Sequence, residues 1–339
     1  MITPDGAENV VYTFMGGADG NHPNAGVIQD AEGNLHGTTS YGGYERDGCR
    51  RTTGCGVVFE VSLNGTEKAL YSFEGKGDGG GPSGNLLLDN EGNLYATTFW
   101  ASTRWPGVVF KVDPEGTETV LHTFRAYKGD GKHPGGNLVM DAQGNLYGTT
   151  QSGGVSGYYG PPDHSNPCYY GGCGTVFEIS AAGEEKILYA FKGWGHGDGA
   201  SPGSLVIDRQ GNLYGLSGAG GIYGYGAIFE ITASAAEKQL YSFTGGEDGG
   251  YPTGLVLDGQ GDLYGTAATG AKYDDGTVFE LTSSGMLEVL HNFAGGSDGQ
   301  GPEGLLRDAQ GNLYGTTTYG GNVNSTCFAG CGVAFKVTP

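Results

Sequence analysis

A sixfold internal repeat constrains what this chain can fold into more than any other feature. The segment GNLYGTT recurs, with small changes, at intervals of 59, 52, 67, 50 and 50 residues. Its six copies begin at Gly33, Gly92, Gly144, Gly211, Gly261 and Gly311. Periods of this length are typical of propellers and solenoids, in which each repeat is one supersecondary unit.

Three further landmarks recur six times each, and together they predict four β-strands per repeat. Segments like GTVFEV begin at Gly56, Gly107, Gly174, Gly226, Gly276 and Gly332. Segments like LYSF end at Phe14, Phe73, Phe124, Phe191, Phe243 and Phe293. Segments of the form D-G-x-x-P begin at Asp19, Asp78, Asp130, Asp198, Asp248 and Asp298, and each leads into an apolar run.

We name the four strands A (the apolar run, such as 254–258), B (262–268), C (276–281) and D (287–293). Strand A is apolar without alternation, which indicates burial on both faces of a sheet. Four-stranded sheets repeated in this way are propeller blades. The sequence therefore predicts an all-β protein, a six-bladed β-propeller. The predicted blades span about 25–73, 84–124, 136–191, 203–243, 254–293 and 304–337.

The two ends of the chain predict how the propeller closes. The sequence starts with a strand D at 8–14 and stops after a strand C at 332–337. Joined end to end, they read like the internal segment GVVFKVDPEGTETVLHTF from Gly107. We expect the N-terminal strand D to complete the blade 304–337, which removes an open sheet edge and makes residues 1–339 a single domain.

The repeats resemble a known family. The pattern GNLYGTT, GTVFE and LYSF-x-GG-x-DG-x-x-P is similar to the GloVer tandem repeat of bacterial surface and secreted proteins, and the similarity covers essentially the whole chain. This resemblance implies an extracellular location, often with a surface anchor. It implies no particular biochemical activity, because fold alone does not determine function.

Charge and hydropathy exclude two classes of partner. Lysine and arginine number 17 and aspartate and glutamate 37, so the net charge is 17 − 37 = −20, and the protein repels polyanions such as nucleic acids. No apolar run reaches the length of about 18 residues needed to span a bilayer. The N-terminus lacks a basic region followed by an apolar core, so we expect a chain without membrane insertion whose export signal has been removed.

The six cysteines form three close pairs along the chain: Cys49 with Cys55, Cys168 with Cys173, and Cys327 with Cys331. Local disulfides are the natural interpretation, and disulfides imply an oxidising compartment such as the cell exterior. Close cysteine pairs also bind zinc, but these spacings are irregular and each pair lies in a different repeat.

Alternating strand direction places the A–B and C–D turns on one face of the blades, the turn face, and the B–C and D–A loops on the other, the loop face. The B–C loops vary in length and content, and variable loops on a rigid scaffold are where binding concentrates. They carry many aromatic residues: Tyr41, Tyr44, Trp100, Trp105, Tyr158, Tyr159, Tyr169, Tyr170, Tyr223, Tyr225, Tyr273, Tyr319 and Phe328. Some of these rings are expected to pack the loops and others to contact a ligand.

Local positive charge accompanies the aromatics of the first two repeats. Arginine beside aromatic rings can hold the carboxylate or sulfate of an acidic glycan, although pairing with Glu45 and Asp47 is the alternative. The predicted ligand-binding residues are Trp100, Trp105, Arg104, Arg46, Arg50, Tyr44, Tyr159, Tyr169 and Tyr223. The sequence assigns no catalytic residues.

The repeated aspartates and the histidines have structural interpretations. The D-G-x-x-P aspartates suit turns, and a ring of Ca²⁺-binding carboxylates is the alternative, so we expect no metal and no cofactor apart from possible Ca²⁺. The aspartates that end strand A are expected to cap the A–B turns. His22 and His133 are expected in solvated loops, whereas His36, His122 and His291 replace tyrosine and are expected to pack.

The leading functional prediction is extracellular recognition of a carbohydrate or cell-surface glycan on the loop face. One alternative is a polysaccharide-cleaving enzyme, a lyase or a glycoside hydrolase, on the same face. Another is a structural or surface-assembly module that self-associates and binds no glycan.

Overall fold

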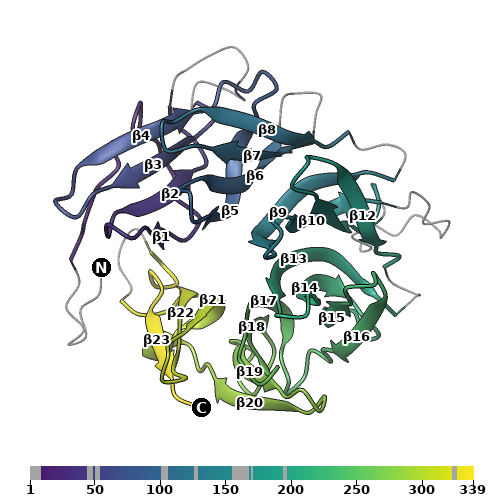
Figure 1. The fold of residues 1–339 in the computed structure, drawn as a ribbon. Coiled ribbons are helices and arrows are strands. Elements are labelled where there is room, and N and C mark those ends of the chain that lie inside the picture. Colours follow the sequence, from purple (N-terminus) through teal and green to yellow (C-terminus); the bar gives the residue numbers. More distant parts are fainter. Residues whose placement is uncertain are drawn as a thin grey trace. The chain divides into compact units, whose positions relative to one another are not determined.

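A computed structural model describes residues 9–43, 49, 54–100, 106–125, 129–154, 168, 171–193, 197–322 and 327–339. Antiparallel sheets follow one another along the chain (Figure 1). The first comprises β1 (Ile28–Gln29), β2 (Leu35–Thr39), β3 (Val57–Val61) and β4 (Glu67–Ser72). The second comprises β5 (Gly80–Leu88), β6 (Leu94–Trp100), β7 (Val108–Val112) and β8 (Glu118–Thr123). The third comprises β9 (Gly131–Met140), β10 (Leu146–Gly153), β11 (Thr175–Ile179) and β12 (Glu185–Ala190).

The second half of the chain continues the pattern. The fourth sheet comprises β13 (Gly199–Ile207), β14 (Leu213–Gly220), β15 (Ala227–Ile231) and β16 (Glu237–Ser242). The fifth comprises β17 (Gly250–Leu257), β18 (Leu263–Thr269), β19 (Thr277–Leu281) and β20 (Leu287–Asn292). The sixth comprises β21 (Gln300–Arg307), β22 (Leu313–Tyr319) and β23 (Ala334–Val337). One 3₁₀ turn, η1 (Gly296–Asp298), precedes β21, and the described residues contain no α-helix.

Six successive antiparallel sheets, five with the strand order A-B-C-D and the sixth with A-B-C among the described residues, are the blades of a β-propeller, as the repeat predicts. The chain divides into two compact units. The first unit comprises 1–148 and 178–186, and the second comprises 149–177 and 187–339. The prediction of a single domain stays a prediction.

A phenylalanine that follows strand D links each sheet to the next within a unit. Phe73 packs edge-on against Phe110 with ring centroids 5.0 Å apart, and Phe243 meets Phe279 in the same way at 5.2 Å. Both members of each pair are fully buried. Strand C supplies the second ring from its centre, where the side chain points toward the preceding sheet. These pairs are the repeating core contact of the fold, because edge-to-face aromatic packing adds to the burial of apolar area.

The A–B turns confirm the predicted role of the aspartates that end strand A. Asp89 accepts hydrogen bonds from the backbone N–H and the side-chain amide of Asn93, both at 2.8 Å, and from the hydroxyl of Tyr95 at 3.0 Å. In the first repeat, His36 stands in for the tyrosine and lies 3.0 Å from Asp30. The histidine and Asn34 donate to the Asp30 carboxylate and, against the opposing effect of burial, lower its pKa to about 2.

The D-G-x-x-P aspartates likewise fasten the D–A turns. The carboxylate of Asp248 accepts a hydrogen bond from the backbone N–H of Thr244 at 2.8 Å and from the hydroxyl of Tyr241 at 3.0 Å. The same backbone contact recurs at the five other copies, Asp19, Asp78, Asp130, Asp198 and Asp298. This favours the turn interpretation of the series over a ring of calcium ligands.

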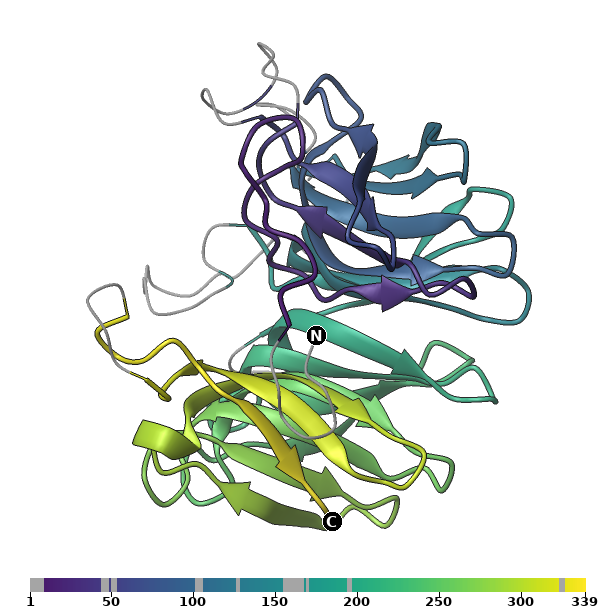
Figure 2. The same cartoon turned by 90° about the vertical axis from the view of Figure 1, so that its left-hand side faces the viewer.

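The sixth sheet has three strands among the described residues, and β23 is its outer edge. In the first unit, Phe14 packs edge-on against Phe59 at 4.9 Å, the contact that a strand-D phenylalanine makes with the next sheet elsewhere. Figure 2 shows the purple N-terminal coil that carries Phe14 running beside the strands of the first sheet. Completion of the last blade by residues 8–14 stays a prediction, and residue 8 lies outside the described residues.

Candidate functional site

Three disulfides lie in the B–C loops and confirm the predicted pairing. Cys49 bonds to Cys55, Cys168 to Cys173, and Cys327 to Cys331. No cysteine is free. In the second unit, Gly193 approaches the Cys168–Cys173 bond so closely that an added Cβ would lie 2.4 Å from a sulfur. The bridges therefore fix the loops against the neighbouring turn, and three disulfides are typical of extracellular proteins.

Most of the predicted ligand-binding residues fall in loops outside the described residues. These are Trp105, Arg104, Arg46, Arg50, Tyr44, Tyr159 and Tyr169. The structure describes two members of the predicted set, Trp100 and Tyr223, which differ in their exposure to solvent.

Trp100 is half-buried and packs against its own sheet, and its role in ligand binding stays a prediction. It ends β6, and its ring lies on the backbone of Gly80 and Gly81, where an added Cβ would come within 2.3–2.5 Å of the ring. Its indole N–H is buried and has no hydrogen-bond partner. The neighbouring Phe99 is the more accessible ring, with 36% of its surface exposed.

Tyr223 is 56% exposed and belongs to an accessible group in the second unit. Its loop also presents Ile222, 66% exposed, and Tyr225, 39% exposed. Tyr225 contacts Tyr251, at the start of β17, edge-on, with ring centroids 5.8 Å apart, and Tyr251 is 44% exposed. We call Ile222, Tyr223, Tyr225 and Tyr251 the aromatic cluster. A group of exposed apolar side chains is a candidate binding surface.

The cluster is built on a strained backbone position. The residue before the D–A proline has a positive φ in all six repeats. These residues are His22 (57°), Gly81 (58°), His133 (52°), Ser201 (52°), Tyr251 (54°) and Gly301 (63°). Glycine adopts this conformation freely, whereas tyrosine does so at a cost of about 1–3 kcal/mol. The backbone N–H of Tyr251 donates to the carbonyl of Tyr225 at 2.8 Å, which holds the two loops together.

The first unit presents a second accessible ring pair at the equivalent place. His133 stacks on Phe99 with ring centroids 4.6 Å apart and an interplanar angle of 14°. His22 similarly meets Tyr41 edge-on at 5.3 Å. The prediction that these histidines are only solvated loop residues is therefore wrong for His133, which is half-buried. Phe99 and Tyr251 are not among the predicted ligand-binding residues, although each stands at a position where the repeats vary.

Buried carboxyl groups line the outer strands. Glutamates at the start of strand D, namely Glu67, Glu118, Glu185 and Glu237, all have a raised pKa. Burial is the main cause, and the charge of the aspartate of the preceding D–A turn adds to it. The pKa of Glu118 rises to about 7. Among the described residues, one group of side chains has the arrangement of metal ligands, formed by His122, Asp130 and Glu185.

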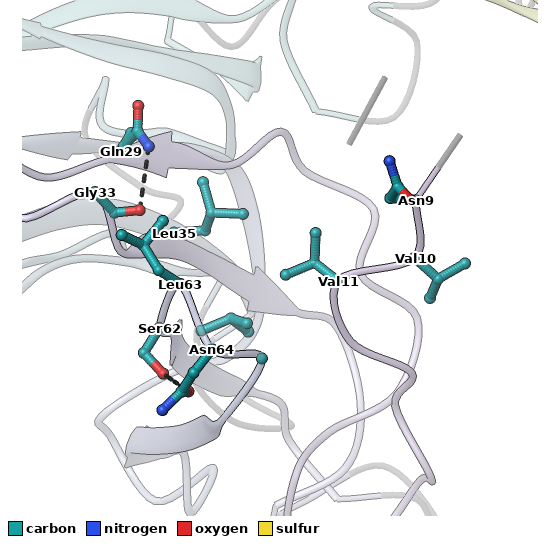
Figure 3. Close-up of a pocket in the computed structure, with 11 residues that line it drawn as sticks. Asn9, Val10, Val11, Gln29, Gly33, Leu35, Ser62, Leu63 and Asn64 are labelled. Atoms are coloured by element: carbon teal, nitrogen blue, oxygen red, sulfur yellow. Dashed lines mark hydrogen bonds between the residues drawn. The ribbon is translucent and has the colours of Figure 1, made fainter. Parts of the chain in front are cut away.

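Two grooves lie on the turn face. One, of about 320 Å³, separates the N-terminal coil from the first sheet, and Figure 3 shows Val11 facing it across from Leu35. The other, of about 770 Å³, lies in the second unit beside Asp258, which pairs with Arg307 at 3.6 Å. Their polar groups are engaged in the turns, as with Ser62, which donates to Asn64. These contacts suit the structural role predicted for this face.

Solved structures share this architecture. A virginiamycin B lyase from Staphylococcus aureus matches with a TM-score of 0.57 and 13% identity, over 93% of this chain and 83% of that one. A streptogramin B lyase matches with a TM-score of 0.54 and 12% identity, over 92% and 78%. A luciferin-regenerating enzyme matches with a TM-score of 0.54 and 13% identity, over 96% and 93%. Likeness at this identity concerns the fold alone.

The blades and their loop-borne aromatic cluster thus define a disulfide-bonded β-propeller with a candidate binding face. The model of the Gloeobacter/Verrucomicrobia repeat matches residues 1–160 and 166–339, and the chain belongs to this family. No curated protein matches the sequence. Among the described residues, no helix has the length and hydropathy to cross a membrane.

Proposed function

We propose that this protein is an extracellular or cell-surface carbohydrate-recognition propeller, which binds glycan on its loop face. The observation that carries the proposal is the aromatic cluster. Tyr225 and Tyr251 expose 39% and 44% of their surface although a backbone hydrogen bond joins them, from the N–H of Tyr251 at the start of β17 to the carbonyl of Tyr225. Tyrosine combines a flat apolar face with a hydroxyl, which suits the alternating CH and OH surfaces of a sugar ring.

The strained backbone at Tyr251 supports a role for its ring in ligand binding. Two other repeats place glycine at this position, Gly81 and Gly301, so the turn itself needs no side chain. Strain of this kind persists where the surrounding structure enforces it and is concentrated at ligand-binding sites. The second accessible pair, Phe99 with His133, offers a further flat surface on the loop face of the first unit.

Affinity electrophoresis tests the proposal. Purified protein is run in native gels cast with a panel of neutral and acidic polysaccharides, and the same gels are then stained for polymer. We expect retardation of the protein by at least one polysaccharide without loss of polymer. Migration unchanged in every gel, together with self-association in light scattering, would favour the surface-assembly alternative.

A polysaccharide-cleaving enzyme is the second candidate. Two of the proteins with this fold are lyases, and His133 provides an imidazole beside an exposed ring. Histidine is a common general base. Clearing of polymer around the protein band, lost in His133→Ala, would make the protein an enzyme.

A further inference from the structure

A tyrosine two residues before the strand-D phenylalanine normally anchors the D–A turn. The hydroxyls of Tyr12, Tyr71, Tyr189 and Tyr241 donate to the aspartates of their D-G-x-x-P segments at 2.8–3.1 Å. His291 takes this place in the fifth repeat and lies 3.2 Å from both oxygens of Asp298. In five repeats, therefore, the aspartate has a side-chain hydrogen-bond partner on strand D.

The second repeat breaks this pattern at His122. Its Nε2 atom lies 3.7 Å from Oδ1 of Asp130, which is too long for a hydrogen bond. This nitrogen is buried and has no hydrogen-bond partner. Oε1 of Glu185, at the start of β12, is also buried and without a partner. The Oε1 atoms of Glu67 and Glu118 at the equivalent positions are buried and unpaired as well, so the unpaired Nε2 of His122 is what distinguishes this repeat. A buried polar atom left unpaired costs about 1–3 kcal/mol and requires an explanation.

The three side chains converge within the first unit. One ligand atom from each of His122, Asp130 and Glu185 lies within 4.8 Å of the others. Two ligands of a tetrahedral ion at bond lengths of about 2.0–2.2 Å stand roughly 3.4 Å apart, so a spacing of 3.7 Å between nitrogen and oxygen suits a shared ion. The Asp130 carboxylate is held in place by the backbone N–H groups of Arg125 and Gly131, each at 2.7 Å.

We propose that His122, Asp130 and Glu185 form a divalent-metal site that binds Zn²⁺. One imidazole nitrogen and two carboxylate oxygens match the preferences of zinc, whereas Ca²⁺ and Mg²⁺ prefer oxygen ligands throughout. The ion satisfies both orphaned atoms at once. It also ties β8 to β12, the outer strands of two consecutive sheets, and thereby replaces the tyrosine anchor of the other repeats.

Zinc titration of metal-free protein tests this site. The protein is stripped with a chelator, and Zn²⁺ binding is followed by calorimetry and by metal analysis after dialysis. We expect about one zinc per chain and a zinc-dependent rise of roughly 3 °C in the unfolding temperature. Parallel titrations with Ca²⁺ and Mg²⁺ are expected to show much weaker binding.

Two variants and a matched control complete the test. His122→Tyr introduces the tyrosine that four of the other repeats carry, and Glu185→Gln removes a charged ligand. Both are expected to bind zinc at least roughly tenfold more weakly and to lose the zinc-dependent shift. His36→Tyr makes the same replacement at a histidine that is hydrogen-bonded to Asp30, and it is expected to bind like the wild type. Undiminished stoichiometric binding in His122→Tyr, no zinc binding by the wild type, or a preference for Ca²⁺ would overturn the proposal.

Discussion

Tyr251 is the single residue on which the proposed binding position depends most. Its φ of 54° suits glycine, and the repeat shows that glycine is acceptable there. A tyrosine at this position gains contact with Tyr225, and an edge-to-face pair contributes about 0.5–1.5 kcal/mol. That gain is comparable to the strain, so the ring is not explained by stability alone.

The positive φ at Tyr251 predicts that a glycine substitution there is less destabilising than an alanine substitution. Tyr251→Gly relieves the strain, whereas Tyr251→Ala removes the ring and keeps the unfavourable φ. We therefore expect the glycine variant to be more stable than the alanine variant by about 1 kcal/mol. Urea unfolding of the two proteins measures the difference. An alanine variant of equal or greater stability would show that the position is not strained.

The raised pKa of Glu118 makes the stability of the folded protein depend on pH. Burial, together with the charge of Asp78, raises its pKa to about 7, so the folded state binds this proton more tightly than the unfolded state. The resulting stability is fully present below a pH of about 4.5 and is lost as the pH rises through about 7. Glu118→Gln is expected to stabilise the protein at pH 8 and to change little at pH 5. Unfolding midpoints at both pH values provide the check, and a gain of equal size at both would contradict this assignment.

At the scale of elements, the phenylalanine pairs hold consecutive sheets together. Phe243, which directly follows β16, and Phe279, in β19 of the next sheet, are completely buried. Phe243→Ala removes one side of this contact and leaves a cavity, so we expect a loss of about 3–5 kcal/mol in the free energy of unfolding. Met286→Ala, at a residue that is 62% exposed, is the control and should change stability by less than about 0.5 kcal/mol. A loss below about 1 kcal/mol in Phe243→Ala would contradict the role of this pair.

The sequence predicts the strands and turns of the fold but not all of the candidate site. Repetition made the strand count and the turn aspartates predictable, because every copy repeats the same local chemistry. It did not reveal that the Trp100 ring lies against Gly80 and Gly81, since this depends on the register of β5 and β6, which pairs Gly80 with Trp100. The unpaired Nε2 of His122 could not be predicted either. The sequence shows that histidine replaces tyrosine at this position, but it does not give the distance from His122 to Asp130.

For the whole molecule, the predicted closure leads to a cross-linking test. Val278 pairs with His291 and Val58 with Tyr71 across strands C and D, so the same register would place Ala334 opposite Tyr12. We expect the double variant Tyr12→Cys with Ala334→Cys to form a fourth disulfide, since opposed residues of antiparallel strands lie about 4.5–5.5 Å apart. The intact mass under non-reducing conditions should fall by two further hydrogens relative to the reduced chain. Free thiols in this variant would contradict closure by this register.

The central claim for the whole molecule is that its loop face binds carbohydrate through the aromatic cluster. The most direct measurement is the dissociation constant of the polysaccharide that retards the protein most, determined for wild type, Tyr225→Ala and Tyr251→Gly. Met286→Ala on the turn face serves as the control. We expect binding to be weakened by roughly tenfold or more in both tyrosine variants and to be unchanged in the control. Equal affinity of all four proteins would contradict the claim.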